Sequence, residues 1–251
     1  MITKITSKQN ERIKYFNQLK DSSFRNKENL FMVEGFHLVD MALERGCVKT
    51  LISLSPYKEE LNDIEQIIVT EEILEKLSST KTPQGIIAIC KMDPFINEVL
   101  GDKVLYLDDI QDPGNLGTIL RTIDSVGLKQ VIVSKETADA YNPKVVRSTM
   151  GAILRIKIIE TDDLVKTLKE AKKNKFKIVA TSLDTNNSIY DIDYKKKVIV
   201  IGNEANGVSK EIQELADNKV KIPMLGKTES LNASVATGIM LYEYVRQKIG
   251  K

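Results

Sequence analysis

Strand-length apolar runs alternate with segments of helical spacing through most of the second half of this chain, and this order constrains the fold more than any other feature. The runs lie at residues 104–107, 130–133, 177–181 and 198–201, and helical segments begin near residues 116, 143, 163, 209 and 232. Parallel strands need long crossover connections, which are usually helices that cover a face of the sheet. The order therefore predicts an α/β fold with a mostly parallel sheet and helices on both faces.

The first part of the chain predicts a smaller α/β unit. Strands are expected near residues 31–33, 51–54, 67–69 and 86–89, and helices near residues 7–19, 37–45 and 71–77. Between this unit and the next buried strand, Asp93-Pro94 and Gly101-Asp102 interrupt both periods. We therefore predict two domains, residues 1–97 and residues 98–251.

Composition excludes several classes of protein. Of the 251 residues, 42% are hydrophobic and 29% are charged, as in globular proteins rather than disordered chains or coiled coils. No apolar run approaches the roughly 18 residues of a membrane helix, and the N-terminus lacks the apolar core of a signal peptide. The expected location is the cytoplasm, with no membrane partner.

Charge and metal-binding residue types narrow the function further. The net charge is only +2, so any basic surface must be local; residues 1–29 carry seven Lys and Arg against three Asp and Glu. The single histidine, His37, and two isolated cysteines, Cys47 and Cys90, offer no metal-ligand spacing and no material for a histidine triad. We therefore expect no metal, and we expect both thiols to fill the core.

A polar cluster at residues 108–121 follows the first strand of the second domain and opens a helix. Pro113 and Gly114 suit a turn, and Asn115 suits a helix N-cap. Arg121 stands within the helix, where an arginine facing a sheet is unusual unless an anion or a polar site lies nearby. The cluster by itself is open to two interpretations, a capped turn or a functional site.

Two further polar clusters follow later strands. Gly202 and Glu204 stand in residues 201–208, at the carboxyl end of a strand, where parallel sheets bind ligands; a glycine turn with a solvated acid is the alternative. Residues 222–236 form an irregular loop before the last helix, whose N-cap is Ser230 or Asn232. Because position 221 is Lys221 rather than glycine, residues 226–228 are not a P-loop, and the missing G-x-G-x-x-G fingerprint argues against an NAD-linked oxidoreductase.

Together the three clusters resemble the motifs of the SpoU/TrmH branch of the SPOUT RNA methyltransferases. The first cluster carries N-x-G-x-x-x-R, the second carries G-x-E-x-x-G, and the third carries S-L-N before the final helix. Their order and spacing match the family over residues 102–250. The N-terminal part is similar to the substrate-binding domain of members that modify ribosomal RNA.

The resemblance implies a fold and a cofactor. It implies a C-terminal trefoil knot in the second domain and, in the first, a fold similar to ribosomal protein L30e/L7Ae-like folds. The cofactor is S-adenosyl-L-methionine, held in the knotted loops largely by backbone groups of the kind that an adenine edge needs. The cofactor-binding residues that it implies are Thr181, Ser182, Leu183, Gly202, Asn203, Gly207, Ile222, Met224, Leu231 and Asn232.

The resemblance also implies the reaction, methyl transfer to a ribose 2′-hydroxyl of RNA. The catalytic residues that it implies are Arg121, Asn115, Glu204, Ser230 and Asn232. In this in-line displacement the enzyme aligns the hydroxyl oxygen and stabilises the developing alkoxide. Because a guanidinium stays protonated in proteins, we expect Arg121 to position a phosphate or stabilise the alkoxide, while a carboxylate or the phosphate takes the proton.

RNA is the expected partner, and the full N-terminal domain favours 23S ribosomal RNA over transfer RNA. The expected RNA-binding residues are Lys4, Lys8, Arg12, Lys14, Arg25, Lys27 and Arg121; a solvated helix face is the alternative. The resemblance implies a homodimer through the final helix, although the same apolar stripe would suit a monomer core. Two alternative functions are an inactive RNA-binding factor in ribosome assembly and a tRNA ribose methyltransferase.

Overall fold

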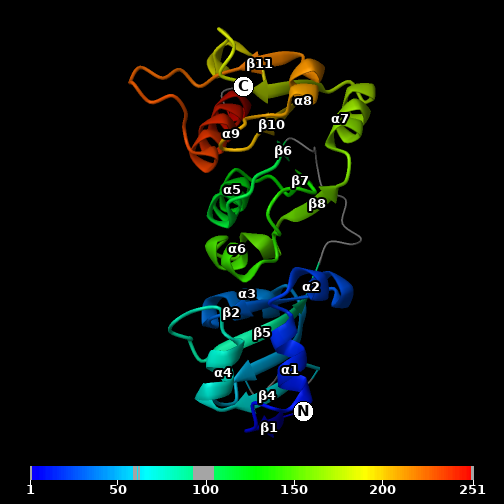
Figure 1. Ribbon diagram of the computed structural model, residues 1–251, viewed down its shortest axis with the longest axis vertical. Coiled ribbons are helices and arrows are strands. Elements are labelled where there is room, and N and C mark those ends of the chain that lie inside the picture. The colour runs from blue at the N-terminus through cyan, green and yellow to red at the C-terminus, as the bar shows by residue number, and fades with distance from the viewer. Residues whose placement is uncertain (1, 59–60, 62, 93–104, 250–251) are drawn as a thin grey trace. The chain divides into compact units, whose positions relative to one another are not determined.

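The structure is a computed structural model that describes residues 2–58, 61, 63–92 and 105–249 (Figure 1). The chain divides into two compact units. The first unit comprises Met1–Ile96 together with Asp139–Leu154, and the second comprises Asn97–Ala138 together with Arg155–Lys251. The predicted domain boundary between residues 97 and 98 lies outside the described residues and stays a prediction. The sequence does not predict that residues 139–154 pack with the first unit.

A mixed sheet forms the centre of the first unit, with its five strands in the order β1-β4-β3-β5-β2. The strands are β1 (Ile2–Ile5), β2 (Leu30–Glu34), β3 (Val48–Ser53), β4 (Glu65–Val69) and β5 (Ile86–Lys91). Strands β1, β4 and β3 run parallel, whereas β5 pairs antiparallel with both β3 and β2. This order leaves β2 at an edge of the sheet.

Helices cover both faces of this sheet. They are α1 (Glu11–Gln18), α2 (Ser22–Glu28), α3 (Phe36–Glu44), α4 (Glu71–Leu77) and α6 (Pro143–Ser148), with a 3₁₀ turn η1 (Ala152–Leu154). On one face, Ile13 of α1 and Leu74 of α4 share a core with Ile52 of β3. Since alternate strand residues face opposite ways, Phe31 of β2 points to the other face, where its ring lies 4.9 Å from that of Tyr141. Helices α3 and α6 pack there against β2.

The second unit contains six strands in the order β11-β9-β10-β6-β7-β8. The strands are β6 (Leu105–Leu107), β7 (Gln130–Ser134), β8 (Lys157–Thr161), β9 (Lys177–Thr181), β10 (Lys197–Ile201) and β11 (Asn218–Val220). Each pairing between neighbours in this sheet is parallel. The predicted α/β class with a mostly parallel sheet is confirmed.

Helices cover both faces of the second sheet as well. They are α5 (Pro113–Ser125), α7 (Leu164–Lys173), α8 (Lys210–Leu215) and α9 (Ala233–Ile249), with a 3₁₀ turn η2 (Ile189–Asp191). Leu168 of α7 and Ile212 of α8 share a core with Ile178 and Val200 of the sheet. Helices α5 and α9 pack against each other and lie on the opposite side of the strands from α7 (Figure 1).

Some elements differ from the sequence expectation, each for a local reason. The sequence does not predict β1 or β11, which have four and three residues and are too short to show a period. It also does not predict the polar helix α2 or the half-exposed strand β8. Pro113 and Gly114, expected to form a turn, instead start α5, because proline suits the first helical position, where its missing N–H has no intrahelical partner.

Two further expectations concern side chains and helix length. Cys47 and Cys90 are buried and unpaired, in agreement with a role in the core. Among the described residues, no helix combines the length and the apolar composition that crossing a membrane requires.

Candidate active site

The three polar clusters meet at the carboxyl edge of the second sheet. Strands β9, β10 and β6 are neighbours, with Ile201 paired to Leu107 and Val200 paired to Ala180. Because parallel strands end at the same edge, the segments that follow them emerge together. These segments are the start of α5 in the first cluster, the turn after β10 in the second, and the loop after β9. The third cluster follows β11, which pairs in parallel with β9 and ends level with it, Val220 against Thr181, so this cluster leaves the sheet at the same edge.

The cap of helix α5 differs from the prediction. Asp112, rather than Asn115, is the N-cap, and its side chain accepts the backbone N–H of Asn115 at 2.8 Å. A carboxylate at this position also complements the positive end of the helix dipole. Asn115 therefore lies within the first turn of the helix, where its side chain is not needed for capping.

The side-chain amide of Asn115 joins the three clusters. Its Nδ2 donates to Oε1 of Glu204 at 2.6 Å, and its Oδ1 accepts from Nδ2 of Asn232 at 2.8 Å. A carboxamide can do both because it carries a donor and an acceptor. We call the row Glu204–Asn115–Asn232 the Asn115 bridge. Both of its bonds lie at the surface, where a substrate can reach them.

Asn232 also starts helix α9. Its Oδ1 accepts the backbone N–H of Ser234 at 2.9 Å and that of Val235 at 3.3 Å. Of the two N-caps that the sequence leaves open, the structure therefore selects Asn232 over Ser230. Because one side chain both caps the helix and closes the Asn115 bridge, the start of α9 orients the site.

Arg121 and Ser230, the other two predicted catalytic residues, are exposed and lie outside the Asn115 bridge. Within the described part of the chain, neither side chain forms a hydrogen bond or an ion pair. Arg121 stands six positions after Asn115, about 9 Å further along the helix axis. Its guanidinium is therefore available to an anionic group of a substrate.

The turn after β10 closes on itself. The N–H of Asn203 donates to the carbonyl of Gly207 at 3.1 Å, and the N–H of Gly207 donates back at 2.9 Å. A Cβ at Gly202 would lie 2.2 Å from the backbone of Gly207 and Val208. The turn itself therefore requires glycine at position 202, and the expected contact of Gly202 with the cofactor stays a prediction. The backbone groups of Asn203 and Gly207 already bond to each other. A contact of either residue with the cofactor stays a prediction.

The loop between β11 and α9 has the free backbone groups that a cofactor needs. Among the described residues, no backbone N–H or C=O from Ile222 to Leu231 enters a hydrogen bond. The segment after β9 runs beside this loop, since the N–H of Ser182 donates to the carbonyl of Val220 at 2.9 Å. Polar backbone groups without protein partners suit the adenine edge of a nucleoside cofactor. The predicted positions Ile222, Met224 and Leu231 therefore fit S-adenosyl-L-methionine.

A glutamine that the motifs do not single out lies beside the same loops. Nε2 of Gln213 donates to the carbonyl of Thr181 at 3.0 Å. Its Oε1 is buried and has no hydrogen-bond partner in the described structure. Leu183, two residues after Thr181, is 65% exposed. The orphaned acceptor of Gln213 adds to the fit for a ligand with amino groups, and the exposed Leu183 offers apolar surface in the segment after β9.

Comparisons with known proteins agree with this geometry. A family model described as SpoU rRNA Methylase family matches residues 102–242, and one described as MRM3-like substrate binding domain matches residues 10–88. The 23S rRNA (guanosine(2553)-2'-O)-methyltransferase RlmP of Bacillus subtilis is 35% identical, over 95% of this chain and 97% of its own.

Solved structures extend these similarities. The AdoMet-bound rRNA methyltransferase from Sinorhizobium meliloti superposes with a TM-score of 0.86 and 31% identity, over 99% of this chain and 98% of that one. The TrmH/SpoU tRNA modifying enzyme of A. aeolicus is 39% identical with a TM-score of 0.55, over 59% of this chain and 76% of that one.

The chain belongs to the SpoU rRNA methylase family. This membership confirms the resemblance that the three motifs predict. It also confirms the enzyme class, an RNA methyltransferase.

We expect several basic residues of this SpoU protein to bind RNA. In the structure, some of them form ion pairs with acidic residues of the first unit. Lys8 lies 2.9 Å from Glu72, and Lys14 lies 2.8 Å from Glu11. Exposed ion pairs of this kind contribute little stability, so the lysines remain able to exchange partners. The expected RNA-binding residues that are exposed and without an ion pair among the described residues are Lys4, Lys27 and Arg121.

Arg12 is held more firmly than these lysines. Its guanidinium forms a two-pronged contact with Glu65, with one bond of 2.7 Å. The hydrogen bonds from Arg12 hold the pKa of Glu65 below its usual range. An RNA phosphate would have to displace this carboxylate, and a contact between Arg12 and RNA stays a prediction.

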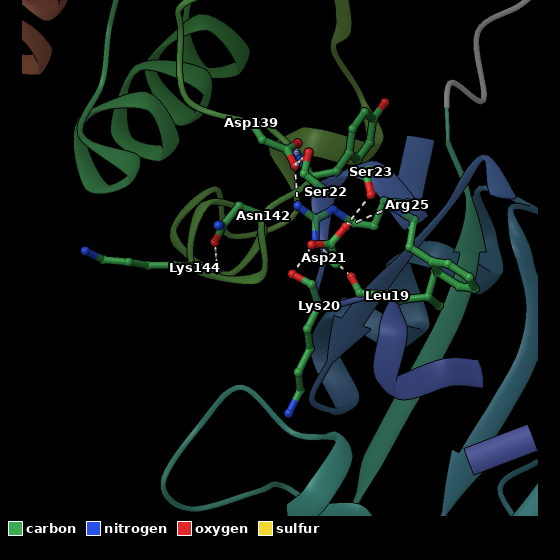
Figure 2. A network of polar contacts seen from close by, with 11 residues as sticks. Leu19, Lys20, Asp21, Ser22, Ser23, Arg25, Asp139, Asn142 and Lys144 are labelled. Atoms are coloured by element: carbon green, nitrogen blue, oxygen red, sulfur yellow. Dashed lines mark hydrogen bonds and ion pairs between the residues drawn. The ribbon is translucent and has the colours of Figure 1, made fainter. Parts of the chain in front are cut away.

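Arg25 does not fit its predicted role. Its side chain is 2% exposed, and it forms an ion pair with the partly buried Asp139 (Figure 2). Nη1 also donates to the carbonyls of Leu19 and Lys20, each at 2.8 Å. The prediction that Arg25 contacts RNA is therefore wrong, because composition cannot tell a basic surface residue from a buried one with a distant partner.

Proposed function

We propose that this protein transfers the methyl group of S-adenosyl-L-methionine to a ribose 2′-hydroxyl of 23S ribosomal RNA. The observation that carries the proposal is the Asn115 bridge, which unites residues of all three family motifs at the carboxyl edge of a parallel sheet. The match of residues 10–88 to a substrate-binding domain supports ribosomal RNA, as do the two rRNA enzymes that align along nearly the whole chain. The tRNA enzyme aligns along only part of it.

The cofactor supplies an electrophilic methyl group bound to a sulfonium. The loop from Ile222 to Leu231 would hold it by backbone groups, with the segment after β9 beside it. The remaining tasks for the protein are to align the ribose oxygen with the methyl carbon and to stabilise the charge that develops on that oxygen.

Glu204 is the carboxylate placed to receive the proton of the ribose hydroxyl. Its Oε1 accepts the Asn115 amide, and its side chain is exposed. In the described structure Oε2 forms no hydrogen bond, so it is available to the hydroxyl. Asn115 and Asn232 act as positioning residues, because they hold Glu204 in one orientation relative to the start of α9.

Arg121 binds the substrate phosphate next to the reacting ribose. A guanidinium offers several N–H donors in a plane and matches two phosphate oxygens at once. Because it stays protonated, it also stabilises the developing alkoxide without taking the proton itself. Ser230, exposed in the loop before α9, is proposed to contact the same sugar-phosphate group.

The finer features implied by the family resemblance belong to this proposal. They are the trefoil knot in the second unit, the L30e/L7Ae-like fold of the first, a cytoplasmic location and a homodimer. Two apolar side chains of α9 support the homodimer, since Val235 is 51% exposed and Tyr242 is 54% exposed. Sedimentation of the whole protein gives its mass in solution, and a monomer at micromolar concentration would contradict the homodimer.

The proposed function is tested by transfer of radiolabelled methyl from S-adenosyl-L-methionine to ribosomal RNA of a strain that lacks the protein. We expect label in 23S RNA that maps to a ribose. Arg121→Ala should lower the rate on the order of 100-fold, and Arg121→Lys should not restore it, because a point charge cannot replace the planar fork. Lys173→Ala, which changes an exposed cation of α7, should match the wild type.

Three outcomes would contradict parts of the proposal. Full activity of Arg121→Lys would show that charge alone suffices and would overturn the role given to Arg121. Cofactor binding without label in naked 23S RNA or in isolated subunits would favour the inactive assembly factor, and label in transfer RNA alone would favour the tRNA enzyme.

A further inference from the structure

A cavity of about 190 Å³ lies within the first unit, at the carboxyl end of the edge strand β2. Its apolar wall includes Met32, Leu38, Val146 and Met150. Pockets for drug-sized ligands have volumes of roughly 300–1,000 Å³. This cavity therefore suits a smaller flat group, about one aromatic heterocycle in size.

Polar side chains surround the apolar wall. Gln84 and Arg147 line the cavity and are exposed. Within the described chain, neither of these two side chains forms a hydrogen bond or an ion pair. A glutamine amide reads the edge of a base, and an arginine plane stacks on a base or binds its phosphate. The cavity thus combines an apolar slot with free groups for a nitrogen heterocycle and an anion.

The polar side of the cavity is fixed in place. Oε1 of Glu34, at the end of β2, accepts the hydroxyls of Ser78 at 2.5 Å and Thr80 at 3.0 Å. Its Oε2 accepts the N–H of Ser79 at 3.2 Å. This carboxylate anchors the segment that leads to Gln84. The slot is therefore pre-organised, which lowers the cost of binding.

Helix α6 supplies the opposite wall although it lies far along the chain. Val146, Arg147 and Met150 come from this helix and the residues just after it. The Arg25–Asp139 ion pair (Figure 2) holds the start of this segment against the N-terminal elements. The ring contact between Phe31 and Tyr141 does the same. The cavity is completed only when both parts of the chain are folded together within the first unit.

We infer that this cavity binds one unstacked nucleobase of the RNA substrate, with Gln84 at the base edge and Arg147 at the adjoining phosphate. The inference rests on the proposed function, because that function makes RNA the ligand. It places RNA recognition at the end of β2 rather than on the basic N-terminal residues alone. Sequence-specific proteins recognise single-stranded RNA in this way, by holding splayed bases in pockets.

The first experiment observes base binding without catalysis. The whole protein is labelled with ¹³C at the methyl groups of its seven methionines and titrated with AMP, GMP, CMP and UMP. We expect at least one nucleotide to shift the signals of Met32 and Met150 in a saturable way, while ribose 5-phosphate leaves them in place. No shift with any nucleotide, or an equal shift with ribose 5-phosphate, would overturn the inference.

The second experiment measures methyl transfer to 23S RNA by cavity variants. We expect Gln84→Ala and Arg147→Ala to raise KM for RNA on the order of 10-fold with kcat and cofactor binding unchanged, because the cavity binds RNA away from the reacting atoms. The matched controls are Gln9→Ala and Lys144→Ala, whose exposed side chains do not line the cavity. Unchanged KM in both cavity variants would contradict the inference.

The two experiments separate the inference from the proposed function. Nucleotide-induced shifts in a wild-type protein that does not methylate RNA would leave the cavity as a base site and overturn the function. Methylation of 23S RNA by a protein whose methionine signals do not shift would support the proposed function and overturn the inference about the cavity.

Discussion

At the residue scale, Asn115 shows how one side chain sets the geometry of the site. The motif identifies Asn115 as a functional residue, but its local context also suits a helix cap. The structure assigns the cap to Asp112 and leaves the Asn115 amide to bond Glu204 and Asn232. Since the amide uses both its donor and its acceptor, no carboxylate of the same shape can replace it.

Asn115→Asp is therefore expected to impair catalysis without unfolding the protein. The change keeps an acceptor for Asn232 but puts a second carboxylate beside Glu204, and the like charges repel. We expect the single-turnover rate of methyl transfer to fall on the order of 100-fold, as for a misplaced catalytic group. Thr118→Ala is the control, because among the described residues the Thr118 hydroxyl bonds only the carbonyl of Gly114 in its own helix. Equal rates in the two variants would show that the Asn115 bridge has no part in the reaction.

At the scale of elements, the turn after β10 determines where Glu204 lies. Its two reciprocal backbone bonds between Asn203 and Gly207 need a glycine at position 202, because the backbone of Gly207 and Val208 lies 2.2 Å from where a Cβ of residue 202 would be. The side chain of Asn203 then ties the turn to the segment after β6 by bonding the Asp109 carbonyl at 2.9 Å. The turn is thus attached to β10, which it follows, and to the segment after the neighbouring strand β6.

Gly202→Ala should open this turn, whereas Gly226→Ala should not disturb its own loop. A Cβ at Gly226 would meet nothing within 4 Å, so the two substitutions form a matched pair. We expect Gly202→Ala to lower the free energy of unfolding by about 1–3 kcal/mol and to weaken cofactor binding, while Gly226→Ala changes the stability by less than about 0.5 kcal/mol. Urea unfolding followed by circular dichroism and calorimetric titration with S-adenosyl-L-methionine measure the two effects. Similar stability of the two variants would contradict this account of the turn.

At the scale of the whole molecule, the chain returns to its first unit after β7. Residues 139–154 pack with the first 96 residues, although they follow a strand of the second sheet. The Arg25–Asp139 pair is the polar contact that secures this return, and Ser22 donates to the same carboxylate at 2.8 Å (Figure 2). Two segments more than a hundred residues apart thus form one core.

Asp139→Ala is expected to destabilise the protein strongly, because it leaves the buried Arg25 without a counter-charge. We expect a loss of about 3 kcal/mol in the free energy of unfolding of the first unit. The double variant Arg25→Met, Asp139→Ala should recover much of this loss, since removing both charges also removes the cost of burying them. Asp162→Ala is the control, because its ion pair with Lys135 is largely exposed. Hydrogen exchange of β2 amides reports on this unit, and equal protection in Asp139→Ala and Asp162→Ala would contradict the prediction.

The sequence by itself determined the α/β class, most strands and helices, and the three motifs. These features depend on residues that are close along the chain, such as the apolar run of β10 or the spacing of Asn115, Gly117 and Arg121. It did not reveal β1 or β11, which are too short for a period and form only by pairing with strands already in place.

The tertiary structure alone decided which side chains meet. It joined Glu204, Asn115 and Asn232 at the edge of a sheet, buried Arg25 against Asp139, and closed a cavity between Gln84 and Arg147. The physical reason is that such contacts depend on strand order, crossover connections and the packing of distant segments, and no local pattern of residue types encodes these. A basic residue that looks free in the sequence can therefore be the most deeply buried charge of its unit.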